Sequence, residues 1–174
     1  MTPRKQSKLD EGRLWDYALR ILARKAYSAG EIKQKLSQRA ALISDVPGVL
    51  TKLKEYGFAD DEKFSETFAQ ARLRNQGFGR SRVLRDLQSK RVSPKVAEQA
   101  IEKTFAGTSE ADLIDNFMAR KYRSKDLVEF LKEEKNLASA YRKLRLAGFT
   151  SNGTLAALKR HAKHAADWDV EENE

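Results

Sequence analysis

Few residues in this sequence could support metal or acid–base chemistry. Its two histidines, His161 and His164, lie three positions apart near the C-terminus, a spacing at which one helix face can hold a metal ion. The chain has no cysteine to supply a thiolate ligand, a nucleophile or a disulfide. We therefore expect two exposed surface histidines, no bound metal and no cofactor.

A second candidate for chemistry is the glycine pair in Gly77-Phe78-Gly79, which precedes two arginines and so could form a phosphate-binding loop. The Walker pattern requires Gly-x-x-x-x-Gly-Lys after a strand, and neither condition is met. We interpret Gly77 as the end of one helix and Gly79 as the entry to the next. No serine–histidine–acid arrangement with an elbow motif is present either. The sequence predicts a protein that is not an enzyme.

The strongest functional signal is a concentration of basic residues in the middle of the chain. Lysine and arginine number 34 against 25 acidic residues, which gives a net charge of +9. Such a balance favours a polyanionic partner, and the planar guanidinium of arginine suits phosphate and carboxylate recognition. A solvated helix surface is the alternative interpretation. The candidate partner-binding or DNA-binding residues are Arg72, Arg74, Arg80, Arg82, Arg85, Lys90, Arg91, Arg120, Lys121 and Arg123.

Two of these arginines allow a geometric prediction. Val83 and Leu87 mark the buried side of one amphipathic helix, so Arg82 and Arg85 should project outward from it. Acidic residues, by contrast, gather at the C-terminus over residues 167–174, where they would compete with phosphate for the basic residues.

Helices must position these residues, because apolar positions recur with helical spacing along the chain from Leu14 onward. Ser28 and Glu31 have the pattern of a capping box, and Ser44 or Asp45 can cap a later helix. No segment alternates with a period of two, so strands have no support. We predict nine helices.

The helical pattern repeats. A shift of 51 residues places Ile32 and Leu36 on Val83 and Leu87, and a third cycle makes Leu144 equivalent to Leu36 and Leu87. A period of about 50 residues is typical of a supersecondary unit repeated in tandem. The predicted fold is all-α, with three tandem three-helix repeats in an elongated, curved arrangement; a single irregular helical domain is the alternative.

The expected boundaries follow from this repeat. They are a flexible basic tail over residues 1–10, repeats over 11–58, 59–106 and 107–166, and an acidic tail over 167–174. No run of about 18 apolar residues exists, and the first ten residues lack the apolar region of a signal peptide. We expect a cytoplasmic protein that does not contact a membrane.

Residues 87–101 have the helix–turn–helix spacing of a DNA-reading motif. The second of these helices carries Glu98 and Glu102 against Lys95 and Lys103, so it offers no net positive charge to a DNA groove. The arginines before it would contact the DNA backbone at best. Any nucleic-acid contact should therefore be independent of base sequence.

Three motifs occur in a fixed order through the central basic region. They are Tyr56-Gly57-Phe58-Ala59-Asp60-Asp61, Arg72-Leu73-Arg74 and Gly77-Phe78-Gly79-Arg80-Ser81-Arg82. In this order and spacing the chain resembles the RecX regulatory family from about residue 14 to residue 165. It departs from the family at Arg91, where a glycine often stands, and at Arg80, where proline is frequent. These departures put the local turn geometry in doubt.

The resemblance implies a monomeric modulator, usually an inhibitor, of the RecA recombinase. Such a protein lies along the groove of the RecA filament on single-stranded DNA, modulates its ATPase and strand-exchange activity, and so regulates DNA repair and recombination. The implied partners are the RecA filament and, through direct non-specific contact, single-stranded DNA. The alternative is a freestanding DNA-binding protein, either sequence-independent or of the helix–turn–helix type.

Overall fold

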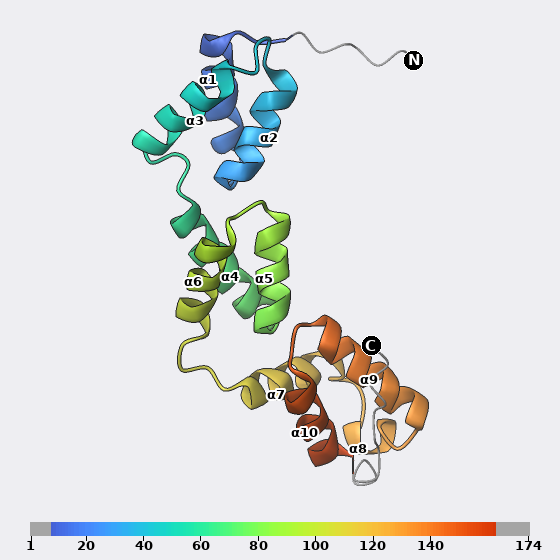
Figure 1. Ribbon diagram of the computed structural model, residues 1–174. Coiled ribbons are helices and arrows are strands. Elements are labelled where there is room, and N and C mark those ends of the chain that lie inside the picture. The colour runs from blue at the N-terminus through green and yellow to red at the C-terminus, as the bar shows by residue number, and fades with distance from the viewer. Residues whose placement is uncertain (1–7, 163–174) are drawn as a thin grey trace, which may run out of the picture. The chain divides into compact units, whose positions relative to one another are not determined.

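The computed structural model describes residues 8–162, where the regular secondary structure is helical apart from one isolated β-bridge between Leu9 and Ala40. Within these residues ten helices follow one another (Figure 1). They are α1 (Glu11–Leu22), α2 (Ala29–Arg39), α3 (Asp45–Glu55), α4 (Asp61–Gln76), α5 (Arg80–Ser89), α6 (Pro94–Phe105), α7 (Glu110–Lys121), α8 (Leu127–Phe130), α9 (Glu134–Leu146) and α10 (Ser151–His161). The all-α prediction is confirmed.

The described residues form one helix more than the nine predicted, because α8 was not predicted. This four-residue helix begins where the carboxylate of Asp126 accepts hydrogen bonds from the backbone N–H groups of Val128 and Glu129. So short an element shows no apolar periodicity in sequence. Among the helices of the described range, none has the length and apolarity needed to span a bilayer.

The chain groups into two compact units, which are described separately. Unit 1 comprises Met1–Ala69 and Asp86–Thr104, and unit 2 comprises Gln70–Arg85 and Phe105–Glu174. Two divisions between the units pass through α4 and α5, whereas the third, between Thr104 and Phe105, lies close to the repeat boundary expected at residue 106. The three-repeat division therefore stays a prediction about the sequence.

Helices α1, α2 and α3 of unit 1 pack together around a core that includes Leu14, Ile32 and Leu36, all fully buried. Leu9 extends this core, since its backbone N–H donates to the Arg39 carbonyl at 2.8 Å. Asp10 then caps α1 by accepting from the backbone N–H of Arg13. Residues 8–10, expected in a flexible tail, are thus attached to the bundle.

The helix starts of unit 1 explain two polar motifs. Ser28 and Glu31 form the predicted capping box at the start of α2. The adjacent aspartates divide their roles: Asp60 accepts from the backbone N–H of Lys63 in α4, whereas Asp61 accepts from the backbone N–H of Ala29 in α2 at 2.7 Å. Of the two caps predicted for α3, Ser44 takes up helical backbone angles and makes no capping hydrogen bond, and Asp45 is the first residue of the helix.

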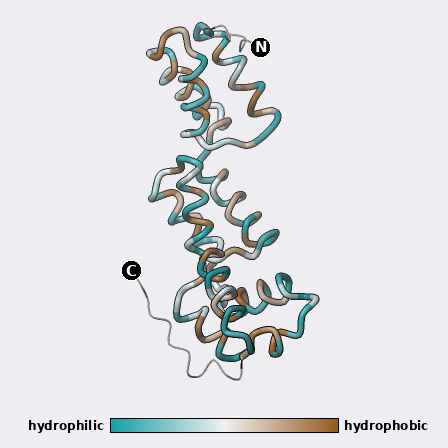
Figure 2. The backbone as a smooth tube through the Cα atoms, turned by 90° about the vertical axis from the view of Figure 1, so that its right-hand side faces the viewer, coloured by the Kyte–Doolittle hydropathy of each residue, from teal (hydrophilic) through white to brown (hydrophobic). Residues whose placement is uncertain are grey.

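Unit 2 contains a second bundle in which α10 packs on α7 and α9. Its core includes Ile114, Met118, Leu144 and Phe149. Leu36, Leu87 and Leu144, which the repeat predicts at equivalent positions, are all buried, each at most 1% exposed. Polar and apolar residues alternate along the helices as amphipathic packing requires (Figure 2).

One kind of hydrogen bond, accepted by a carbonyl group at a helix end, recurs in both units. The carbonyl oxygens of Arg39, Lys90 and Ala147, each at the end of the second helix of a predicted repeat, accept a hydrogen bond from an earlier part of the chain. The donors are the backbone N–H of Leu9, the hydroxyl of Ser28 and the backbone N–H of Gly79. The carbonyl groups at a helix end lack intrahelical partners, so each predicted repeat has its second helix capped by the segment before it.

We expect replacement of Arg91 with glycine to stabilise the protein. Arg91 has a φ of 61°, a left-handed conformation that costs a residue with a side chain about 1–2 kcal/mol. The exposed hydrogen bond from Arg91 to Gln34 contributes about 0.5 kcal/mol of stability, which the glycine variant would lose. Arg91→Gly should therefore raise the free energy of unfolding by about 0.5–1.5 kcal/mol in urea titrations. Arg91→Ala retains the strain and loses the hydrogen bond, so a gain from alanine equal to that from glycine would contradict this explanation.

Candidate basic binding site

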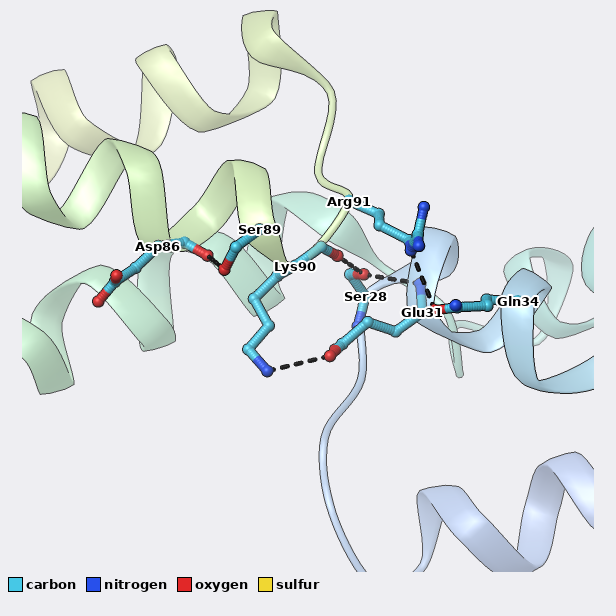
Figure 3. Close-up of polar contacts among 7 residues, drawn as sticks. All are labelled: Ser28, Glu31, Gln34, Asp86, Ser89, Lys90 and Arg91. Atoms are coloured by element: carbon cyan, nitrogen blue, oxygen red, sulfur yellow. Dashed lines mark hydrogen bonds and ion pairs between the residues drawn. The ribbon is translucent and has the colours of Figure 1, made fainter.

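Lys90 and Arg91 lie in unit 1, in the turn after α5, and both are engaged within the fold (Figure 3). Lys90 Nζ lies 3.0 Å from Glu31 Oε1, and the two side chains are only 27% and 17% exposed. Arg91 Nε donates to Gln34 Oε1 at 3.0 Å. Their backbone approaches α2 so closely that a Cβ on Gly30 would lie 2.4 Å from the Arg91 carbonyl oxygen. We interpret both residues as holding the turn on α2 rather than as a free binding surface.

The arginines at the start of α5, in unit 2, are also partly used by the fold. Arg80 donates to the Phe105 carbonyl at 3.2 Å. Arg82 is half-buried, with its guanidinium 5.2 Å from the centre of the Phe78 ring, so the prediction that it projects outward is wrong. The turn that contains Gly148 lies against the backbone of Arg82, and helical periodicity does not reveal this contact. Arg85 is exposed, as predicted.

Three other predicted arginines come together in unit 2. Arg74 belongs to α4, Arg120 to the last turn of α7, and Arg123 lies two residues after α7. All three line a surface groove of about 510 Å³. The groove also contains apolar side chains, Leu73 and Leu113 among them. We call this feature the arginine groove. Lys121, next to Arg120 in sequence, is exposed but does not line the groove. Arg72 is half-buried and does not line the groove either.

Gly77 positions Arg120 in the arginine groove. Gly77 ends α4 with a φ of 64°, a conformation that favours glycine. A Cβ at this position would lie 1.8 Å from Arg120 Nη2, and Arg120 Nη1 donates to the Asn75 carbonyl at 3.4 Å. The missing side chain therefore leaves room for the guanidinium. This explains the first glycine of the Gly-Phe-Gly motif, for which sequence reasoning gave only a helix-ending role.

The arginine groove combines fixed positive charge with an apolar floor. Guanidinium groups stay protonated at all physiological pH values and bind phosphate or carboxylate oxygens through paired N–H donors. Apolar side chains between them can contact a nucleobase or an aliphatic side chain. Sequence reasoning found the arginines but not the apolar side chains among them, because helical spacing does not show that Leu73 and Leu113, both partly buried, lie beside these arginines.

The helix–turn–helix alternative gains no support from the side chains of α6. Lys103, one of the two lysines on this helix, forms an ion pair with Glu66. The hydrogen bond to Glu66 and the negative charge of that side chain raise the pKa of Lys103. The positive charge of α6 is thus balanced by neighbouring acids, as its sequence indicates.

The predicted pair of exposed histidines requires a correction. His161 is half-buried, with Nε2 3.2 Å from Asp115 Oδ1, and Arg160 donates to the same carboxylate. The helix α10 packs on α7 and brings these side chains together. His164 lies outside the described residues. Within residues 8–162, no cluster of three or more histidine or acidic side chains is arranged to hold a metal ion.

Comparison with known proteins gives one consistent family. Residues 60–101 match a family model described as RecX, second three-helix domain. Proteins named Regulatory protein RecX from Legionella pneumophila strain Corby and Chromohalobacter salexigens are 31% and 33% identical over 87 residues, which is 50% of this chain and 57% of each relative. The matched part of the chain thus spans a little over half the length of these relatives.

Longer but weaker similarity extends over most of the chain. Regulatory protein RecX of Syntrophotalea carbinolica is 23% identical over 137 residues, which is 79% of this chain and 88% of that protein. A crystal structure of regulatory protein RecX aligns with a TM-score of 0.65 at 17% identity, covering 86% of this chain and 71% of the other. RecX from Lactobacillus salivarius gives 0.67 at 14% identity, covering 87% and 96%. These two likenesses show a common fold.

Proposed function

Because this chain belongs to the RecX family, we propose that it binds the filament that RecA recombinase forms on single-stranded DNA. Binding inhibits ATP hydrolysis and strand exchange by the filament, and so regulates DNA repair and recombination. The observation that carries this proposal is the arginine groove, where exposed guanidinium groups surround apolar side chains. A filament of protein on DNA offers both carboxylates and phosphates to such a site.

The charge distribution supports a partner of this kind. Contacts between arginine and phosphate release condensed counterions, so they favour binding to a polyanion and weaken as salt rises. The groove reads no base sequence, because guanidinium contacts to a phosphate backbone carry no sequence information. Two compact units on one chain also allow two sets of weak contacts to act together at high effective concentration. The chain is expected to bind as a monomer.

The test is ATP hydrolysis by RecA on single-stranded DNA with increasing amounts of this chain. We expect inhibition at concentrations far below those that coat naked DNA, because the filament supplies contacts that DNA alone lacks. Sedimentation of the same mixtures measures how much chain binds filament and how much binds DNA. Inhibition that appears only when naked DNA is saturated would favour the freestanding DNA-binding protein instead.

A further inference from the structure

Three aromatic side chains gather on the surface of unit 1, whereas the arginine groove belongs to unit 2. The ring centroids of Trp15 and Tyr56 lie 5.8 Å apart, those of Trp15 and Phe58 6.4 Å, and those of Tyr56 and Phe58 6.2 Å. Tyr56 is 63% exposed and Phe58 is 48% exposed. We call these three residues the aromatic cluster. Large apolar rings in mutual contact and open to water mark an interaction surface.

The fold does not require the exposed rings. Helix α3 ends at a turn in which Gly57 has a φ of 72° and the backbone N–H of Phe58 donates to the Leu53 carbonyl at 2.8 Å. This helix-ending turn is made by backbone groups and needs glycine at position 57, not an aromatic residue on each side. Trp15 alone packs partly against the first bundle's core. The turn therefore fixes where the rings of Tyr56 and Phe58 lie without burying them.

The charges around the aromatic cluster favour a protein partner over nucleic acid. Trp15 belongs to α1 and Tyr56 directly follows α3, and each of these helices carries equal numbers of acidic and basic residues. In α1 these are Glu11, Arg13, Asp16 and Arg20, and in α3 they are Asp45, Lys52, Lys54 and Glu55. Sites that stack nucleobases combine aromatic rings with a positively charged groove. An aromatic centre with a rim of both charges is instead the usual composition of a protein–protein interface.

Lys52 is a basic residue beside the aromatic cluster and could contact a phosphate, but it already contacts Trp15. Its Nζ lies 4.5 Å from the centre of the Trp15 ring, where the negative face of the indole attracts the ammonium group. This contact covers one face of Trp15. The faces that remain for a partner are therefore chiefly those of Tyr56 and Phe58, the two exposed rings.

We propose that the aromatic cluster docks an apolar segment of a protein partner, one with aliphatic side chains flanked by residues of both charges. This inference rests on the proposed function, and under it the partner is a RecA protomer of the filament. Tyrosine and phenylalanine each bring a large contact area with few rotatable bonds, so burial of these two rings would dominate the apolar part of the interface.

The experiment measures the affinity of the full chain for a preassembled RecA filament on single-stranded DNA. Tyr56→Ala and Phe58→Ala should each lower that affinity about tenfold or more, as truncation of interface aromatics does. Leu42→Ala and Ile43→Ala are the matched controls, because both residues belong to unit 1 and are 63% exposed. They should bind within about twofold of the wild-type chain. Circular dichroism should show equal helical content in all variants, since exposed side chains rarely support the fold.

Binding measurements at high salt and on naked DNA distinguish this inference from the proposed function on which it rests. The losses in Tyr56→Ala and Phe58→Ala should persist at high salt, because apolar contacts are not screened as charges are. Weaker binding of both variants to naked oligothymidylate would overturn the inference in favour of base stacking. A wild-type chain that binds filament no more tightly than these two variants would overturn it and leave the proposed function intact. A wild-type chain that binds no filament would overturn both.

Discussion

Reversal of the charge at Arg74 and Arg123 together should lower the affinity of the chain for the RecA filament about 10- to 100-fold at low salt. Both side chains are exposed and line the arginine groove, so glutamate there replaces attraction to carboxylates or phosphates by repulsion. Arg120 is left unchanged, because its guanidinium packs against Gly77 and a change there would also disturb the turn. The fold should survive, since neither replaced side chain is buried.

The matched control carries the same change in net charge at other exposed arginines. Arg24→Glu with Arg142→Glu also lowers the net charge by four units from +9, but neither residue lines the groove. Binding should fall less in this control, because long-range attraction is screened over about 10 Å at 0.1 M salt. The loss in Arg74→Glu with Arg123→Glu should shrink as salt rises. Equal losses in the two double variants would assign the effect to net charge and remove the groove from the interface.

Local features of the fold could be predicted from the sequence because they depend on neighbouring residues. The capping box at Ser28 and Glu31 formed as its spacing indicates, and Leu87 is fully buried as its helical face requires. The short helix α8 could not be predicted, since one side-chain cap at Asp126 starts it. Nor could the half-burial of Arg82, which depends on the ring of Phe78.

The candidate site was only partly predictable, because charge in the sequence does not reveal which charges are already paired. Lys90 belongs to the most basic stretch of the chain, yet an ion pair with Glu31, 59 positions away, holds it within unit 1. Arg120 lies 46 positions after Arg74 in the sequence, yet both line the same groove. Contacts between distant residues decide both outcomes. The aromatic cluster escaped notice for the same reason, since Trp15 and Tyr56 meet only in the folded chain.

Gly148→Ala should destabilise the protein more than any other glycine-to-alanine change compared with it. Gly148 has a φ of 95°, and a Cβ there would lie 2.3 Å from the backbone nitrogen of Arg82. The left-handed conformation costs alanine about 1–2 kcal/mol, and forcing a methyl group against backbone adds about 1–3 kcal/mol. We therefore expect the free energy of unfolding to fall by about 2–5 kcal/mol in urea titrations.

Two further glycines separate these contributions to the cost of Gly148→Ala. Gly57 has a φ of 72° but open space around its Cβ position, so Gly57→Ala should show the conformational cost alone, about 1–2 kcal/mol. Gly79 lacks a positive φ, yet a Cβ on it would lie 2.4 Å from the Gly148 carbonyl oxygen, so Gly79→Ala should show the cost of close approach alone, about 1–3 kcal/mol. If Gly148→Ala costs no more than Gly57→Ala, the turn after α9 can move away from α5. The close backbone contact would then contribute little to the stability of unit 2.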